Sequence, residues 1–304
     1  MIIRNLSKRV ETIDDFCHLI LLDKLYLQKL VRLCPLHYIE IPFKKKDGTP
    51  RPIRAPKEKL KIIQRVILDN LLSCIKLPPC CYGFSKGKSI IENAKAHLRG
   101  DYLLNLDIKD FFPSVHYTKV EKIFLGMGLD RDFTNILCNL TTHEYKLPQG
   151  APTSPKLASV VLHNLDYRLL KLAQSNHLTY TRYFDDISFS GNKRIITLEK
   201  DILRIIREEG YSVHTSKDKK KLFAKNETKE INGILLKDKK LSLKNIDELF
   251  SYVENINRHG LSRLITDNPE KERQSIAGKI SFLRQIDPER SHKLKVLYDF
   301  IEWL

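Results

Sequence analysis

The chain has 304 residues, of which 42% are hydrophobic and 9% aromatic, so its composition is that of a folded globular protein and not of a disordered one. The formal net charge is +16, and it is unevenly spread. Residues 1–100 hold 20 Lys and Arg against 9 Asp and Glu, residues 214–244 hold 10 against 4, and residues 101–213 are neutral. Two basic regions around a neutral centre indicate a polyanion partner such as nucleic acid, or else a merely solvated basic surface.

Several classes of protein fit the sequence poorly. The six cysteines form no C-x-x-C pair, which argues against a zinc site. No uninterrupted apolar run approaches the roughly 18 residues of a membrane span. The N-terminal sequence "MIIRNLSKRVETIDDF" is charged early and lacks the apolar core of a secretory signal. We therefore expect a cytoplasmic protein with reduced thiols and no membrane association.

The first hundred residues combine helices with a basic hairpin. Apolar residues at helical spacing predict a helix over residues 12–34. Residues 38–56, "YIEIPFKKKDGTPRPIRAP", alternate around Asp47-Gly48, which is a strong hairpin signal. An amphipathic helix is predicted over residues 57–77, ended by Pro78-Pro79. The basic residues near the tip of the hairpin are Lys44, Lys45, Lys46, Arg51 and Arg54.

The next segments combine glycines, a short apolar strand and helices. In "YGFSKGKSIIENAKAHL", three residues separate Gly83 from Gly87 where a phosphate-binding loop needs four, so we expect an ordinary loop before a helix over about residues 89–98. "DYLLNLDIKDFFPSV", residues 101–115, predicts a buried strand in which Asp107 carries the one charge between Leu103 and Ile108. Helices are predicted near residues 117–127 and 130–141.

A loop rich in Pro and Gly, "LPQGAPTSP", precedes the next predicted helix. Ser154 is predicted as its N-cap, with Pro155 at the first helical position. A core stripe then recurs every four residues, at Leu157, Val161, Leu165 and Leu169.

The remaining third begins with "YTRYFDDISFSG", residues 180–191, which predicts two strands joined by a bend at Phe184–Asp186. A helix stopped by Gly210, a strand over residues 211–214 and a small hairpin over residues 230–243 are predicted to follow. From about residue 244 the chain is predicted to be helical, with helix starts at Asn268-Pro269 and Asp287-Pro288.

Asp185 and Asp186 stand side by side in an apolar environment. Successive strand residues face opposite sides, so a tight turn is needed to aim both at one point. Buried carboxylates are costly and repel each other, and a divalent cation shared with Asp107 would balance them better than Arg182. Hard oxygen ligands favour Mg²⁺, and two ions about 4 Å apart would suit in-line phosphoryl transfer. The alternative is a salt-bridged or exposed turn.

The motifs "KKKDGTPRPIR", "NLDIKDFFPSV", "LPQGAPTSP" and "YFDD" occur in the order found in reverse transcriptases, and the chain resembles that family from about residue 35 to residue 245. "GFSKGKSIIENAKAHL", with Asn93-Ala94 and His97 spaced as N-A-x-x-H, resembles bacterial retron reverse transcriptases in particular. Two departures are Phe184, where those enzymes usually have Ala, and Ile231-Asn232-Gly233 in place of their Val-Thr-Gly.

The resemblance implies an α+β fold of the right-hand polymerase type. Residues 1–100 would form N-terminal helices and fingers. Residues 101–230 would form a palm of antiparallel sheet plus helices, with a fingers insertion near residues 117–155. Residues 231–304 would form a primer-grip hairpin and a helical thumb.

The resemblance also implies roles for particular residues. Asp107, Asp185 and Asp186 would be the catalytic metal ligands, with the carbonyl of Ile108 as a further ligand. Phe112 matches the residue that blocks a ribose 2′-hydroxyl, although a core aromatic fits equally well, and either Lys219 or Lys220 could protonate pyrophosphate unless it is simply solvated. The implied nucleotide-binding set is Lys45, Arg51, Arg54, Phe112, Gln149, Gly150 and Lys220. Asn93 and His97 would be structural or contact RNA.

The implied function is RNA-directed DNA polymerisation by a two-metal nucleotidyltransferase that uses two Mg²⁺ ions. Template and primer would be one structured non-coding RNA, copied from deoxynucleotide triphosphates into a branched RNA–DNA molecule (msDNA) that starts at a guanosine 2′-hydroxyl. The product would serve anti-phage defence with a separate effector protein. Alternatives are another bacterial defence reverse transcriptase, template-independent or protein-primed, and a non-catalytic RNA-binding protein with a polymerase fold.

Overall fold

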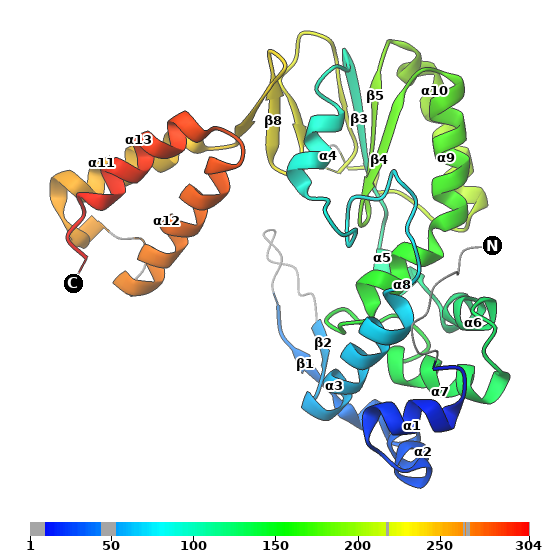
Figure 1. The fold of residues 1–304 in the computed structure, drawn as a ribbon. Coiled ribbons are helices and arrows are strands. Elements are labelled where there is room, and N and C mark those ends of the chain that lie inside the picture. Colours follow the sequence, from blue (N-terminus) through cyan, green and yellow to red (C-terminus); the bar gives the residue numbers. More distant parts are fainter. Residues whose placement is uncertain (1–9, 44–52, 217–218, 264, 266–267, 304) are drawn as a thin grey trace.

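The structure is a computed structural model that describes residues 10–43, 53–216, 219–263, 265 and 268–303. Figure 1 shows N-terminal helices and a hairpin at one end, a central sheet with helices packed against it, and C-terminal helices that project from the side. The combination of separate helices with antiparallel sheets confirms the predicted α+β fold class.

The N-terminal region begins with α1 (Ile13–Ile20) and α2 (Lys24–Arg32), followed by a short 3-10 turn over Cys34–His37. The prediction of one continuous helix over residues 12–34 was wrong. Leu21 takes a left-handed conformation with φ 53° and ends α1, and the side chain of Asp23 then accepts from the backbone N–H of Tyr26 to cap α2. A capping aspartate inside an apolar pattern is the reason for the break.

The predicted basic hairpin is present. Strand β1 (Tyr38–Ile41) pairs antiparallel with β2 (Ile53–Pro56), with Tyr38 opposite Pro56. Its turn, including Lys45 and Arg51, lies outside the described residues. The predicted amphipathic helix follows as α3 (Glu58–Ile67), which continues in a π-helical turn over Leu68–Leu72.

The central sheet has the strand order β4-β5-β3-β6, and every neighbouring pair is antiparallel. Its strands are β3 (Tyr102–Asp107), β4 (Thr179–Tyr183), β5 (Asp186–Gly191) and β6 (Lys221–Phe223). Leu104 and Leu106 face a core shared with α9 (His163–Ser175) and α10 (Arg194–Glu208), whereas Leu103 faces α4 (Ile90–Ala96). Strand β3 is thus buried on both faces, as its apolar sequence indicates.

Helices α5 (Phe111–Ser114), α6 (Tyr117–Gly126), α7 (Arg131–Thr141) and α8 (Ser154–Val161) lie in the chain between β3 and β4. Two predictions need correction here. Thr153, and not Ser154, is the N-cap of α8, because the hydroxyl of Ser154 donates to the carbonyl of Pro148 at 2.7 Å. The predicted core stripe also spans two helices, since the chain breaks at Leu162 between α8 and α9.

A second sheet follows the central one, with β7 (Lys229–Ile231), β8 (Ile234–Lys237) and β9 (Lys240–Leu243) in that order. The prediction of a simple hairpin over residues 230–243 missed its third strand. The strand predicted over residues 211–214 is reduced to one bridge between Val213 and Ile108. Two hydrogen bonds form this bridge. The N–H of Lys109 donates to the carbonyl of Ser212, and the N–H of His214 donates to the carbonyl of Asp107.

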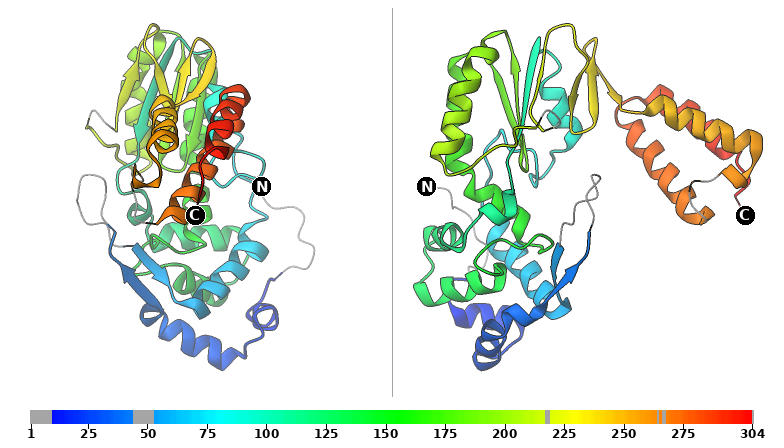
Figure 2. Two further views of the ribbon diagram at one scale, coloured as in Figure 1. Left: turned by 90° about the vertical axis from the view of Figure 1, so that its left-hand side faces the viewer. Right: turned by 180° about the vertical axis from the view of Figure 1, so that it is seen from behind.

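The C-terminal helices are α11 (Ile246–His259), α12 (Pro269–Arg284) and α13 (Pro288–Asp299), with a 3-10 turn over Leu261–Arg263. The predicted helix starts at Pro269 and Pro288 are confirmed, each behind a capping side chain. These helices share a core of their own, formed by residues such as Val253, Ile276 and Leu294. Figure 2 shows them beyond the second sheet, on the opposite side of the central sheet from α9 and α10.

Within the ranges that the structure describes, no helix is both long enough and apolar enough to cross a membrane.

Candidate active site

Asp107, Asp185 and Asp186 come together where β3 ends and β4 turns into β5. Asp186 is the first residue of β5 and lies in register opposite both Tyr183 and Asp107. Phe184 and Asp185 form the turn, and the carbonyl of Asp185 accepts from the N–H of Ile108 at 3.0 Å. The predicted bend thus exists, and it places the two adjacent aspartates beside the third.

The charges of Asp107 and Asp185 act on Asp186. Asp107 is buried, with 6% of its surface exposed. The pKa of Asp186 is raised to about 7, first by burial and then by the negative charges of Asp185 and Asp107. A site in which three carboxylates repel one another at close range favours a bound cation.

A cation from the chain itself already lies at this position. The ammonium of Lys219 donates to Oδ2 of Asp107 at 2.5 Å, and Nε2 of His214 lies 3.5 Å from Oδ1. The pKa of Lys219 is raised, chiefly by this hydrogen bond, with smaller contributions from the charges of all three aspartates. Lys220, in contrast, pairs with Glu199 of α10, so the structure brings Lys219 and not Lys220 to the carboxylates.

The residues fit hard divalent ions in donor chemistry and charge. Among the described residues, no three His, Cys, Asp or Glu side chains stand close enough together to count as a preformed metal centre. Mg²⁺ does not require one, because it commonly takes one or two carboxylates and completes its shell with water and substrate phosphates. Asp107 and Asp186 on neighbouring strands, with Asp185 in the adjoining turn, supply that oxygen set, and the N–H of Ile108 faces the same turn.

A pocket of about 260 Å³ opens beside Asp107 and Asp186. It lies between the central sheet and the turn that joins β7 to β8, and Lys219, Glu230 and Asn232 also line it.

A chain of two asparagines reaches Asp186 from the second sheet. Nδ2 of Asn232 donates to Oδ2 of Asp186 at 2.9 Å, and Nδ2 of Asn93 donates to Oδ1 of Asn232, also at 2.9 Å. Asn93 lies on α4 and is 1% exposed. The amide of Asn232 therefore has a fixed orientation with its donor toward the carboxylate. Asn93 was predicted to be structural or to contact RNA, whereas Asn232 was noted only as a departure from the family's Val-Thr-Gly. Their contact joins residues 139 positions apart, and no spacing rule reveals it.

His97 is also internal. Its two ring nitrogens lie 2.6 Å from the hydroxyl of Ser190 and 2.7 Å from that of Thr181, so the ring joins β5 to β4. Complete burial lowers its pKa to about 3. In this structure Asn93 and His97 therefore make internal contacts, with almost no surface left for RNA.

Two of the predicted nucleotide contacts, Arg54 and Gly150, lie against each other. Arg54 of β2 pairs with Glu144 and lies 3.6 Å from Glu40. Gly150 has φ 123°, and a Cβ there would lie 2.8 Å from a methyl of Ile53 and 3.2 Å from the carbonyl of Arg54. A glycine is therefore needed at this position for its close approach to β2.

The other predicted nucleotide contacts are Gln149, Phe112, Lys45 and Arg51. Gln149 is half-buried in the same loop as Gly150. Phe112 is partly buried, 5.4 Å ring to ring from Phe111, and packs on the main core. Lys45 and Arg51 lie outside the described residues.

Comparisons with known proteins agree with this geometry. A family model described as "Reverse transcriptase (RNA-dependent DNA polymerase)" matches residues 43–247. The chain is 30% identical to the Retron Ec86 reverse transcriptase of Escherichia coli over 250 residues, which cover 82% of this chain and 75% of that protein. It is 33% identical to the Retron Mx162 reverse transcriptase of Myxococcus xanthus over 230 residues, covering 66% of this chain and 47% of that one.

Among solved structures, a foamy viral protease-reverse transcriptase in complex with double-stranded DNA aligns with a TM-score of 0.49 and 22% identity. The alignment covers 91% of this chain and 43% of the viral chain.

Proposed function

Because this chain belongs to the reverse transcriptases and, among them, to the RNA-directed DNA polymerases of bacterial retrons, we propose that it copies a structured non-coding RNA at the Asp107–Asp185–Asp186 centre. The observation that carries the proposal is the register of the palm strands. It sets Asp186 opposite Asp107 and leaves Asp185 in the adjoining turn.

In the proposed reaction, the primer hydroxyl gives up its proton to solvent, and its oxygen forms a bond to the α-phosphorus of a deoxynucleotide triphosphate. The bond from that phosphorus to the bridging oxygen breaks, and pyrophosphate leaves and takes up a proton. When bound, two Mg²⁺ ions would activate the attacking hydroxyl and neutralise charge on the leaving group. Asp107, Asp185 and Asp186 would hold them, and the Ile108 carbonyl is a further proposed ligand.

Other residues of the chain would orient this centre and the substrate. Asn232 keeps the carboxylate of Asp186 in place through a hydrogen bond of 2.9 Å. Lys219, which already lies within reach of the carboxylates, is the better placed of the two lysines to meet the triphosphate and protonate pyrophosphate. Arg54 is the described arginine on the basic hairpin, and its charge suits a triphosphate.

We assign the parts of the chain as for a right-hand polymerase, with fingers over residues 1–100, a palm over residues 101–230 and a primer-grip hairpin and thumb over residues 231–304. The separate core of α11–α13 supports a distinct thumb. The basic regions at residues 1–100 and 214–244 support RNA as template and primer. The product would be branched msDNA begun at a guanosine 2′-hydroxyl and used with an effector protein in anti-phage defence in the cytoplasm.

The test is to express the protein with the RNA encoded beside it, purify the complex, add deoxynucleotides and sequence the DNA across its junction with RNA. The proposal predicts DNA complementary to that RNA and joined to one internal guanosine. DNA that starts at the end of a separate primer would contradict retron-type priming. Products without a template match would favour a template-independent defence enzyme.

A further inference from the structure

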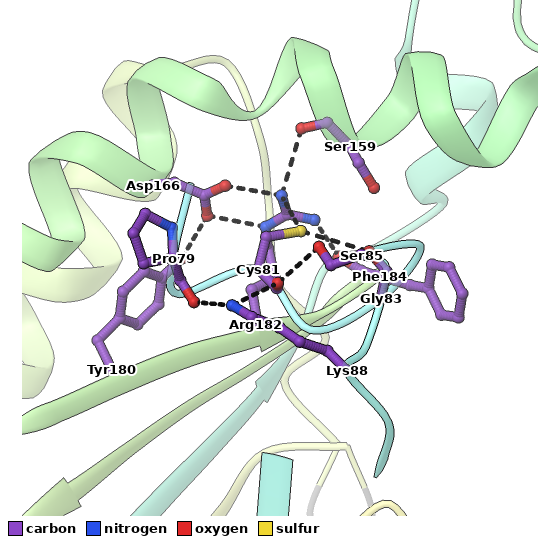
Figure 3. A network of polar contacts seen from close by, with 10 residues as sticks. All are labelled: Pro79, Cys81, Gly83, Ser85, Lys88, Ser159, Asp166, Tyr180, Arg182 and Phe184. Carbon is purple, nitrogen blue, oxygen red and sulfur yellow. Dashed lines mark hydrogen bonds and ion pairs between the residues drawn. The ribbon is translucent and has the colours of Figure 1, made fainter. Parts of the chain in front are cut away.

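Arg182 lies on the strand that leads to the catalytic turn and is completely buried. Among the described residues it is the largest fully buried side chain. Its partner is Asp166 of α9, which is also completely buried. Nε and Nη2 of the arginine donate to the two carboxylate oxygens at 2.8 and 2.7 Å, and the hydroxyl of Tyr180 donates to Oδ1 at 2.7 Å. Figure 3 shows the guanidinium of Arg182 beside the carboxylate of Asp166, between the helix that carries Asp166 and the sheet, so the charge of Arg182 is paired with Asp166.

The same guanidinium also holds the catalytic turn. Its Nη1 donates to the carbonyl of Phe184 at 2.8 Å, and its Nη2 lies 3.3 Å from the carbonyl of Ser159 on α8. That Phe184 carbonyl belongs to the peptide bond that precedes Asp185. Phe184 has φ 57°, a left-handed conformation that a bulky residue adopts only when its surroundings enforce it. Arg182 supplies one such constraint, from inside the fold.

A second constraint comes from the loop over residues 79–88. The backbone of Arg182 exchanges hydrogen bonds with Cys80 and Tyr82, both at 2.8 Å. A Cβ at Gly83 would lie 2.9 Å from the backbone nitrogen of Phe184, and the rings of Phe84 and Phe184 are 5.0 Å apart.

The loop is itself fixed from within. Ser85 donates to the carbonyl of Cys81 at 2.8 Å, and the ammonium of Lys88 reaches the carbonyls of Pro79 and Cys81 (Figure 3). The turn is therefore held between the buried ion pair and a rigid loop.

We propose that Arg182 and Asp166 are positioning residues for the catalytic turn. Asp166 fixes the guanidinium, which holds the Phe184 carbonyl, and the turn then presents Asp185 and Asp186 to Asp107. This inference rests on the proposed role of the aspartates and adds a residue pair that touches neither metal nor substrate. Because the pair acts on the geometry of one peptide bond, its removal should lower the catalytic rate and not only the stability of the fold.

The test removes both charges together. Removing a single partner would leave an unpaired buried charge and destabilise the fold, whereas replacing both with apolar side chains of similar volume is often neutral for stability. The Asp166→Leu, Arg182→Met double variant is therefore compared with the wild type. Arg168→Met is the matched control, since Arg168 lies on the same helix but pairs at the surface with Glu208 and Glu209.

Four quantities are measured: the melting temperature, the affinity for a synthetic RNA template annealed to a DNA primer, kcat and KM for deoxynucleotide, and hydrogen exchange of the peptide over residues 180–191 without metal. We expect an unchanged affinity, a melting temperature lower by a few degrees because the buried Tyr180 hydroxyl loses its acceptor, and a kcat lower by about 100-fold, the effect of about 1 Å of misplacement. The turn peptide should exchange about tenfold faster, which activity loss alone would not produce. The control should match the wild type in all four.

A well-folded double variant with a kcat within about threefold of the wild type would overturn the proposal. If the double variant does not fold, Arg182→Lys keeps the charge beside Asp166 but not the planar fork, and the same drop in kcat with faster exchange of the turn is expected. Failure of the proposed function looks different. There, the wild type would not extend the primer, while the exchange measurement would still report whether the pair holds the turn.

Discussion

Acidification should weaken the fold through His97, because this side chain is buried and neutral. Its pKa in the folded protein is about 3, lowered by burial from an ordinary value of 6.5. Between these two pH values the unfolded chain binds a proton that the folded chain does not. The free energy of unfolding that depends on neutral His97 is therefore fully present above pH 6.5 and is lost as the pH falls towards about 3. Each pH unit in that range costs about 1.4 kcal/mol, so lowering the pH from about 6.5 to about 4.5 costs roughly 2–3 kcal/mol.

The assay is urea unfolding followed by circular dichroism, for the wild type and His97→Gln, at about pH 7 and about pH 4.5. At the higher pH the variant should be less stable by about 1–3 kcal/mol, because the hydroxyls of Thr181 and Ser190 lose their partner. At the lower pH this difference should shrink by roughly 2–3 kcal/mol, or change sign, since glutamine takes up no proton. Carboxylates that titrate in both proteins cancel in the comparison.

His259→Gln is the control, because His259 is exposed at the end of α11 and should leave the pH dependence unchanged. If the difference in stability between wild type and His97→Gln were equal at the two pH values, His97 would be protonated in the folded protein at the lower pH, contrary to this prediction.

Two further substitutions probe the site and the loop beside it. Asn232→Asp is nearly isosteric and keeps the left-handed backbone (φ 49°), but it turns the donor that faces Asp186 into a repelling carboxylate. In a primer-extension assay its kcat should fall about 10- to 100-fold. The control Asn245→Asp, at another left-handed asparagine (φ 62°), should keep the wild-type kcat. Gly150→Ala adds a methyl group 2.8 Å from β2 at φ 123° and should lower stability by about 1–3 kcal/mol in thermal unfolding. Gly128→Ala, at φ 87° with open space around it, isolates the backbone contribution, and equal losses in the two variants would show that contact with β2 is unimportant.

The sequence predicts the hairpin of β4 and β5 well because local rules determine it. Two alternating strands flank an aspartate pair that must turn, and the register then follows from the alternation of buried side chains. The starts of α12 and α13 at prolines follow from similar local rules. The break at Leu21 was missed because leucine carries no turn signal, and the capping role of Asp23 is hidden within an apolar pattern.

What the sequence does not predict are contacts made across the fold. Arg182 precedes the catalytic pair by three residues and looks like its counter-ion, yet it pairs with Asp166 because its side chain points to the other face of the hairpin. Gly150 looks like a glycine that admits a nucleotide, yet the backbone that approaches it belongs to β2. In both cases the residue type indicated a special role, but the sequence did not predict which residue it contacts, because contacts between residues far apart in the chain are determined by packing.

We propose that Asp185 and Asp186 support polymerisation opposite Asp107. Primer extension on an RNA template with Mg²⁺ tests this proposal, with the wild type, the Asp185→Asn, Asp186→Asn double variant and Asp201→Asn, which alters a partly exposed aspartate on α10 that pairs with Arg204. We expect DNA synthesis by the wild type and by Asp201→Asn, and none by the double variant at an unchanged melting temperature. Extension by the double variant at the wild-type rate would contradict it.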